Sequence, residues 1–264
     1  MANTREFDGV ARRELTVFYV LDTSGSMVGT PIATLNRAME ETVEVLKEQA
    51  KKNADALLKI AVMEFNSGCR WVQPVGPEDM EDFFWENLEA GGITDVGAAL
   101  NELDSKLSRN EFLDSMTGAY MPIIIFMTDG YATDDYEKSV KKIRQNKWFL
   151  RATKIGFAIG DNPDTNMVCD VVGNKEAVVR TNDLQNFAKL LKFASVTSTM
   201  LVSKSRTSEE NIDGSTILAG AKKESEKEID LINDSESGNL EPESAVEPMP
   251  VDTTDGWPDY KEWK

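Results

Sequence analysis

Three oxygen-bearing side chains stand at alternate positions in the segment Asp22-Thr23-Ser24-Gly25-Ser26. A carboxylate and two hydroxyls at this spacing can face a single point where the chain turns after a strand. Oxygen ligands of this kind suit a hard divalent cation such as Mg²⁺. The segment is therefore a candidate metal site.

Two other segments could add oxygen ligands to the same site. Thr94 ends the loop Gly91-Gly92-Ile93-Thr94 ahead of a helical pattern, and its hydroxyl could be a third neutral ligand. Asp129 follows the apolar run 123–127. Taken singly, each has a simpler explanation, because Thr before a helix is a common N-cap and Asp after a strand is a common turn residue. Together, the three segments are more specific than any one of them.

The surrounding pattern predicts a doubly wound α/β domain, with a mostly parallel central sheet, one antiparallel edge strand and helices on both faces. Strands are expected at 15–21, 57–65, 69–75, 122–127, 153–159 and 177–180. Helices are expected at 31–52, 78–88, 95–109, 135–148, 164–172 and 183–201. Asn66-Ser67-Gly68 favours a hairpin between the second and third strands, which supplies the antiparallel edge. In such sheets ligands bind at the carboxyl ends of the strands, where Asp22 and Asp129 are expected.

Composition limits the classes of function. The chain has 264 residues and a formal net charge of −17, which argues against nucleic acid or an anionic membrane surface as the main partner. It contains no histidine, which excludes Ser-His-Asp catalysis and His-ligated zinc. The apolar run 121–127 is too short to span a bilayer and the first residues lack a signal-peptide pattern. We therefore expect a soluble cytoplasmic protein.

We divide the chain into an N-terminal arm at 1–9, the α/β domain at 10–201 and an acidic tail at 202–264. Residues 205–264 contain 16 Asp or Glu and 6 Lys or Arg, a net charge of 6 − 16 = −10. Such a composition buries too little apolar surface to offset the cost of ordering, so we expect this tail to be disordered.

The tail ends in an aromatic motif, with Trp257, Tyr260 and Trp263 inside the last nine residues, 256–264. Trp and Tyr are frequent anchors at protein interfaces, so the motif predicts a docking segment for a partner. The alternatives are that these aromatic side chains fold back onto the domain or have no role.

In order and spacing, the three candidate segments resemble the von Willebrand factor A domain and its metal-ion-dependent adhesion site. In that family Asp-x-Ser-x-Ser, a Thr on a later loop and an Asp after the fourth strand surround Mg²⁺. The resemblance implies that Ser24 and Ser26 bind the ion through their hydroxyls, and that Thr94 binds it directly or through water. It implies that Asp22 and Asp129 act largely through bound water and as hydrogen-bond acceptors.

A site of this composition would leave one coordination position open to solvent, and its neutral hydroxyls would leave the ion much of its positive charge. An Asp or Glu of a partner protein could complete the shell. We therefore expect a non-enzymatic, Mg²⁺-dependent protein-binding module, with Mn²⁺ or Ca²⁺ as alternative ions. The motifs at 18–27 and 128–130 are similar to those of the bacterial intracellular TerY-type branch, which is associated with tellurium resistance and stress. That resemblance implies a protein kinase or phosphatase as partner.

The alternative is a Mg²⁺-dependent phosphohydrolase, because Asp22, Asp129, Asp134 and Asp135 are carboxylates near expected strand ends and such sites can run aspartyl-phosphate chemistry. A nucleophile strand of that kind is expected to carry Asp-x-Asp, whereas the second position here is Ser24. Asp134 and Asp135 also fit the N-terminus of the helix that follows them.

Overall fold

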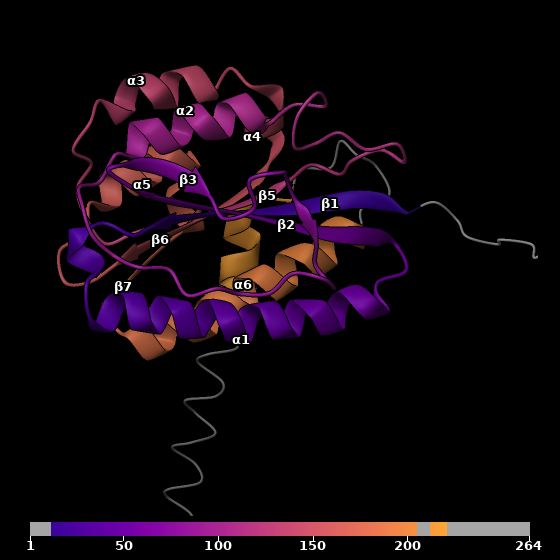
Figure 1. Ribbon diagram of the computed structural model, residues 1–264, viewed down its shortest axis with the longest axis horizontal. Coiled ribbons are helices and arrows are strands. Elements are labelled where there is room, and N and C mark those ends of the chain that lie inside the picture. Colours follow the sequence, from indigo (N-terminus) through magenta and orange to yellow (C-terminus); the bar gives the residue numbers. More distant parts are fainter. Residues whose placement is uncertain (1–11, 205–211, 221–264) are drawn as a thin grey trace, which may run out of the picture. The chain divides into compact units, whose positions relative to one another are not determined.

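A seven-stranded, mostly parallel sheet forms the centre of the protein (Figure 1). This computed structural model describes residues 12–204 and 212–220. The strands lie in the order β3-β2-β1-β5-β6-β7, and β4 also pairs with β2. Their bounds are β1 Arg13–Asp22, β2 Ala56–Asn66, β3 Gly68–Trp71, β4 Glu78–Asp79, β5 Ile123–Thr128, β6 Thr153–Ile159 and β7 Val178–Thr181.

The antiparallel edge predicted from the sequence is confirmed. β1, β2, β5, β6 and β7 pair in parallel, whereas β3 runs antiparallel to β2 with Asn66 opposite Gly68. The two-residue β4 extends the same edge, with Ile60 opposite Glu78. The hairpin therefore lies beside the carboxyl end of β2.

Helices cover both faces of the sheet, as predicted. α1 (Thr30–Lys52) and α6 (Leu184–Lys204) pack on one face, and α2 (Val96–Lys106), α3 (Tyr136–Ile143), α4 (Lys147–Arg151) and α5 (Thr165–Val172) pack on the other. Figure 1 shows α1 and α6 below the sheet and α2 and α3 above it. Two single 3₁₀ turns are also present, η1 (Gly25–Met27) and η2 (Lys175–Ala177).

β1 is apolar from Val17 to Leu21, where both of its faces are covered. Tyr19 and Leu21 belong to the core beneath α1 and α6, while Phe18 and Val20 belong to the core on the opposite face, and all four are fully buried. Among the described residues, no helix is both long and apolar enough to cross a membrane.

The helix predicted at 78–88 is wrong. β4 is followed by a turn and then by a segment without regular structure. Its backbone pairs with neighbouring elements instead: Met80 N donates to Leu58 O at 2.9 Å, and Asn36 of α1 exchanges hydrogen bonds of 2.8 and 2.9 Å with the backbone of Leu88. Met80, Phe83 and Leu88 are buried, and their spacing imitated one face of a helix.

The helix predicted at 135–148 is divided into α3 and α4. Asn146 separates them, and its side chain accepts a hydrogen bond from Trp148 N at 2.9 Å. This interaction starts α4 as a new helix, because an Asn side chain at the N-cap satisfies a backbone N–H that has no partner within the helix.

The folded region extends beyond residue 201, where the sequence analysis placed the end of the domain. α6 continues to Lys204, and residues 214–220 are helical. Ile217 and Leu218 are each only 1% exposed and belong to the core beneath α1 and α6. The predicted arm at 1–9 and the aromatic motif at 256–264 lie outside the described residues.

Candidate metal centre

The candidate ligands lie where β1 and β5 are neighbours in the sheet. From β1 the chain passes into α1 on one face, whereas from β5 it passes into α3 on the other face. Loops that leave adjacent parallel strands in opposite directions open a crevice at the carboxyl edge of the sheet. Asp22 is the last residue of β1, and Asp129 directly follows β5.

Asp22 is fixed by hydrogen bonds at both carboxylate oxygens. Oδ1 accepts from Ser24 N at 2.7 Å, and Oδ2 accepts from the hydroxyl of Thr128 at 2.5 Å. The residue is 0% exposed. Burial raises the pKa of Asp22, the nearby charge of Asp129 acts in the same direction, and the hydrogen bonds from Thr128 and Ser24 oppose this shift. The charged form is therefore disfavoured here unless a cation compensates it.

A chain of hydroxyls links the first loop to Asp129. Ser24 Oγ and Ser26 Oγ are 3.1 Å apart, and Ser26 Oγ donates to Asp129 Oδ1 at 2.6 Å. Burial also raises the pKa of Asp129, and the Ser26 hydrogen bond opposes the shift. The two loops that follow β1 and β5 thus present their oxygen atoms to one another.

Thr94 borders the same space. A Cβ placed on Gly130 would lie 3.5 Å from Ser26 Oγ and 3.7 Å from Thr94 Oγ1. The structure therefore brings together all five residues that the sequence analysis named, namely Asp22, Ser24, Ser26, Thr94 and Asp129.

The loop that carries Thr94 is clamped against the first loop by backbone hydrogen bonds. Gly25 N donates to Gly92 O at 3.1 Å, and Gly91 N donates to Thr23 O at 2.8 Å. Gly92 has φ +83°, and a Cβ there would lie 2.5 Å from the hydroxyl oxygen of Ser67 in the β2–β3 hairpin. Glycine is required at this position both by the backbone conformation and by the close contact.

Thr133 also holds the Thr94 loop, a role that the sequence analysis missed. Its hydroxyl accepts from Thr94 N at 3.0 Å and donates to Asp95 Oδ1 at 3.1 Å, and its own N–H donates to Thr94 O at 2.9 Å. Asp95 accepts a further hydrogen bond from Gly68 N at 2.9 Å. The loops after β2, before α2 and after β5 are thereby tied into one unit.

Asp134 differs from its predicted role. Only Asp135 caps α3, accepting from Lys138 N at 3.4 Å, whereas Asp134 accepts from the first N–H groups of α2, those of Gly97 and Ala98, at 2.9 and 3.0 Å. A Cβ on Gly97 would lie 2.8 Å from Asp134 Oδ2. Gly97 was the signal in the sequence that could have indicated this contact, because a glycine there allows another part of the chain to approach closely.

The centre is rich in hydroxyls and poor in charged ligands. Within the described part of the chain, no group of three or more His, Cys, Asp or Glu side chains is placed to hold a metal ion. Any ion at this site would therefore rely on Ser and Thr oxygens beside two carboxylates. Such a donor set suits Mg²⁺ better than a soft transition metal.

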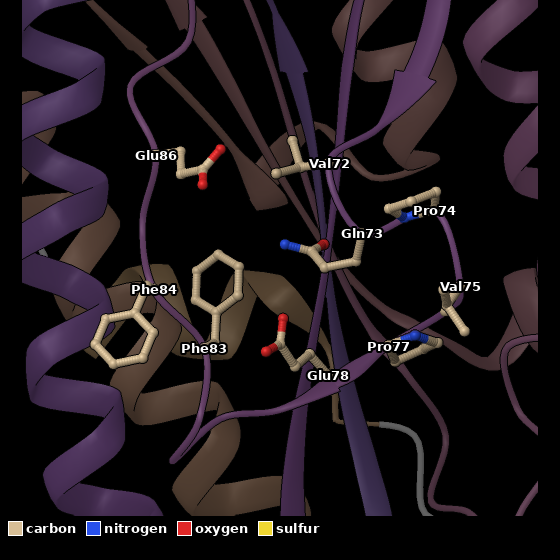
Figure 2. Close-up of a pocket in the computed structure, with 10 residues that line it drawn as sticks. Val72, Gln73, Pro74, Val75, Pro77, Glu78, Phe83, Phe84 and Glu86 are labelled. Atoms are coloured by element: carbon tan, nitrogen blue, oxygen red, sulfur yellow. The ribbon is translucent and has the colours of Figure 1, made fainter.

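The hollow drawn in Figure 2 lies apart from this centre. It has a volume of about 460 Å³ and lies between the segment 72–78 and the segment that carries Phe83 and Glu86. Gln73, on its wall, accepts a hydrogen bond from Val62 N in the middle of β2 at 2.9 Å. The five candidate ligands do not line it.

Comparison with known families agrees with this geometry. The family model of the von Willebrand factor type A domain matches residues 17–132. Over this stretch, 116 of the 264 residues, the chain is similar to a von Willebrand factor type A domain. The match includes the loops of Asp22, Thr94 and Asp129. No functionally curated protein matches the chain.

Solved structures show the same fold. Proximal thread matrix protein 1 from the mussel byssus, solved with a zinc-occupied MIDAS motif, aligns with a TM-score of 0.53 and 19% identity over 69% of this chain and 47% of its own. A von Willebrand factor type A protein from Catenulispora acidiphila aligns with a TM-score of 0.50 and 17% identity, over 71% of this chain and 43% of its own. The ArnB paralog VWA2 from Sulfolobus acidocaldarius aligns with a TM-score of 0.51 and 14% identity, over 70% of this chain and 45% of its own. This chain thus spans less than half the length of each.

Proposed function

We propose that this von Willebrand A-type domain is a Mg²⁺-dependent protein-binding module, in which the ion is held at an adhesion-type site and binds a carboxylate of a partner protein. The observation that carries the proposal is the continuous series of oxygen atoms from Ser24 through Ser26 to Asp129, at separations of 3.1 and 2.6 Å.

These separations fit the requirements of the ion. Mg²⁺ binds oxygen at about 2.0–2.1 Å with octahedral geometry, so neighbouring ligand oxygens lie about 2.9 Å apart. The hydroxyl oxygens of Ser24 and Ser26, which are both proposed to bind the ion directly, are 3.1 Å apart, close to that value. The raised pKa values of Asp22 and Asp129 also fit, because a cation would offset the cost of their buried charge.

Each residue has a distinct part in the proposed site. Ser24, Ser26 and Thr94 would bind the ion through their hydroxyls, while Asp22 and Asp129 would accept hydrogen bonds from its bound water. When bound, the ion would supply a positive charge with an open coordination position in a strongly acidic protein. A partner's Asp or Glu is the ligand that this position favours.

The rest of the partner would lie beside the loop at Gly91 and Gly92. A polar hollow of about 540 Å³ adjoins this loop, and Glu64, Asn66 and Arg70 form part of its wall. Arg70 pairs with Glu64 at 2.7 Å, so a charged partner side chain would compete with an existing ion pair. This hollow is where we expect partner selectivity.

The identity of the ion is part of the proposal. The zinc-occupied MIDAS motif of the mussel protein supports a divalent cation at the corresponding position. Zinc in proteins is usually bound by Cys or His, and none of the five candidate ligands is either of these. Mg²⁺ is therefore favoured, with Mn²⁺ or Ca²⁺ as alternatives.

A binding role is better supported than hydrolysis. A phosphohydrolase of the alternative kind would need a free carboxylate as nucleophile. Asp22 is fully buried with both oxygens engaged, and Asp134 is engaged at both oxygens by α2. We therefore propose a non-enzymatic use of the site.

The cellular setting is proposed from motif similarity alone. The resemblance of residues 18–27 and 128–130 to the TerY-type branch supports a cytoplasmic stress or tellurium-resistance system with a kinase or phosphatase partner. The aromatic motif with Trp257, Tyr260 and Trp263 is proposed as a second contact for such a partner.

Isothermal titration of the metal-free protein with Mg²⁺ and Mn²⁺ tests the proposal. We expect saturable binding of one ion, which the Ser24→Ala, Ser26→Ala double variant loses. Ser115→Ala, Thr117→Ala is the matched control, because these hydroxyls also form an i, i+2 pair, at 3.3 Å, outside the metal centre. Retained binding in the first double variant, or no binding by wild type at millimolar ion, would refute the site.

A further inference from the structure

A cationic cavity of about 470 Å³ lies at the opposite edge of the sheet. Its wall contains Arg13 at the start of β1, Arg109 after α2, and Lys147 and Arg151 of α4, which we call the cavity cations. Of the described residues that line it, none is Asp or Glu. Arg13 and Asp22 are the two ends of the ten-residue β1, so about 30 Å separates the cavity from the metal centre.

The cavity cations have no acidic partner among the described residues. The acids closest to them in sequence are paired elsewhere: Glu14 lies 3.6 Å from Lys59, and Glu111 lies 3.0 Å from Lys106. Four positive charges around one hollow repel each other unless an anion is present. In a chain whose net charge is −17, a cavity in which every charged residue among the described lining is positive is a local reversal of sign.

Arginine dominates the cavity. Three of the four cavity cations are Arg, although only ten of the 29 Lys and Arg residues of the chain are Arg. A guanidinium group donates two parallel hydrogen bonds to a phosphate or carboxylate, which an ammonium group cannot do. The arginine-rich composition therefore indicates a binding site for a planar or tetrahedral oxyanion, and not positive charge that serves only solubility.

Aromatic rings hold two of these arginines in place. The guanidinium carbon of Arg13 lies 4.0 Å from the centroid of Tyr120, and that of Arg109 lies 5.8 Å from the centroid of Trp148. Arg13 also donates to Ala119 O at 3.0 Å. Side chains restrained in this way lose less conformational freedom when they bind a ligand.

We propose that this cavity binds a phosphate monoester on a partner protein, that is, a phosphorylated side chain of a peptide segment. A phosphate monoester carries a charge of about −1.5 to −2 at pH 7 and three acceptor oxygens, more charge and more acceptor oxygens than a carboxylate, so it fits several guanidinium groups around one hollow. Leu150, next to Arg151 and 61% exposed, offers an apolar contact to the flanking peptide. Nucleic acids and anionic membranes are disfavoured because their extended charge would meet the acidic remainder of the protein.

The test uses the full-length protein in EDTA, so that its outcome is independent of the metal centre. The probes are two fluorescent pools of degenerate peptides, one with phosphoserine and one with serine at a fixed central position. We expect at least tenfold tighter binding of the phosphoserine pool, and at least a tenfold loss of this binding in the Arg109→Gln, Arg151→Gln variant. Lys138→Gln, Lys141→Gln removes the same two charges from exposed positions on α3 and should change affinity less than twofold.

Three outcomes would overturn the proposal. The first is equal affinity for the two peptide pools, and the second is unchanged binding in the double arginine variant. The third is tighter binding of inorganic phosphate or of phosphatidylserine vesicles than of the phosphoserine pool, which would assign the cavity to a free anion or to a membrane surface. If the double arginine variant unfolds at a lower temperature than wild type, Lys147→Gln tests the same cavity with one substitution.

Discussion

Asp134 accepts a 2.9 Å hydrogen bond from the backbone N–H of Gly97, which lies 37 residues earlier in the chain. Its second oxygen accepts from Ala98 N at 3.0 Å, so one carboxylate caps the start of α2. The neighbouring Thr133 binds the backbone of Thr94 on the same loop. The position of the Thr94 hydroxyl is therefore set by residues that follow β5, in addition to those of its own loop.

Replacement of Asp134 by Asn should weaken both stability and metal binding. Asn has one acceptor oxygen in place of two, so one of the N–H groups of Gly97 and Ala98 loses its partner, at a cost of about 0.5–1.5 kcal/mol of unfolding free energy, and a looser α2 start would displace Thr94. We expect a several-fold rise in the dissociation constant for Mg²⁺, measured by calorimetry beside urea unfolding.

Asp135→Asn is the matched control for this prediction. Asp135 caps α3 at 3.4 Å, so its replacement should lower stability slightly and leave the affinity for Mg²⁺ unchanged. An equal change of affinity in the two variants would show that Asp134 has no specific connection to the metal centre.

The two carboxylates of the candidate centre should differ in their effect on the metal-free fold. Asp22→Ala leaves the Thr128 hydroxyl and the Ser24 N–H without partners in a buried place, at a cost of about 1–3 kcal/mol. Asp129 is half-buried and accepts from Ser26, which is exposed, so Asp129→Ala should cost less than about 1 kcal/mol.

Thermal unfolding of both alanine variants in EDTA provides the measurement. Both should lose Mg²⁺ binding, while only Asp22→Ala should unfold at a clearly lower temperature than wild type. From the sequence we would expect Asp22→Ala to leave the fold largely intact. Equal unfolding temperatures of the two variants would support that simpler expectation against the structural one.

The fold could be predicted from the sequence because its signals are local and mutually consistent. β1 is buried on both faces, so the run from Val17 to Leu21 has no polar interruption before Asp22. The three candidate metal segments each sit directly after a strand or before a helix. Topology then places them at one edge of the sheet, which spacing along the chain was sufficient to indicate.

The errors arose where a local pattern has a distant partner. The buried side chains of Met80, Phe83 and Leu88 repeat at helix-like intervals, but Asn36 and β2 provide the backbone partners. Asp134 precedes one helix and caps another. In both cases the hydrogen-bond partner lies far away in the sequence, so it cannot be identified from the neighbouring residues.

Truncation should show that residues 212–220 belong to the fold. Ile217 and Leu218 are each 1% exposed, and burial of such side chains contributes about 1.5–3 kcal/mol each before the cost of ordering the segment. A variant that ends at Lys204 should therefore unfold at a clearly lower temperature than one that ends at Gly220. Identical unfolding temperatures would place the end of the stable domain at α6.

Lys154 predicts a rise of stability with pH. Its ammonium group donates to the carbonyls of Phe149 and Ala152 at 2.9 and 3.0 Å, and burial lowers its pKa to about 8, against an opposing effect of Asp213. An unfolded chain, with the ordinary Lys pKa of 10.5, binds more protons than the folded chain between about pH 8 and 10.5. The unfolding free energy should therefore increase across this window, by at most about 3 kcal/mol.

Urea unfolding of wild type and Lys154→Met at several pH values from 7.5 to about 10.5 isolates this contribution, because other Lys and Tyr residues titrate equally in both proteins. The difference in unfolding free energy between them should shift in favour of wild type as the pH rises. Lys138→Met, which replaces a lysine at an exposed position, is the matched control for the substitution itself. If the difference in unfolding free energy between wild type and Lys154→Met did not change with pH, the charged form of Lys154 would be as stable in the folded protein as in water.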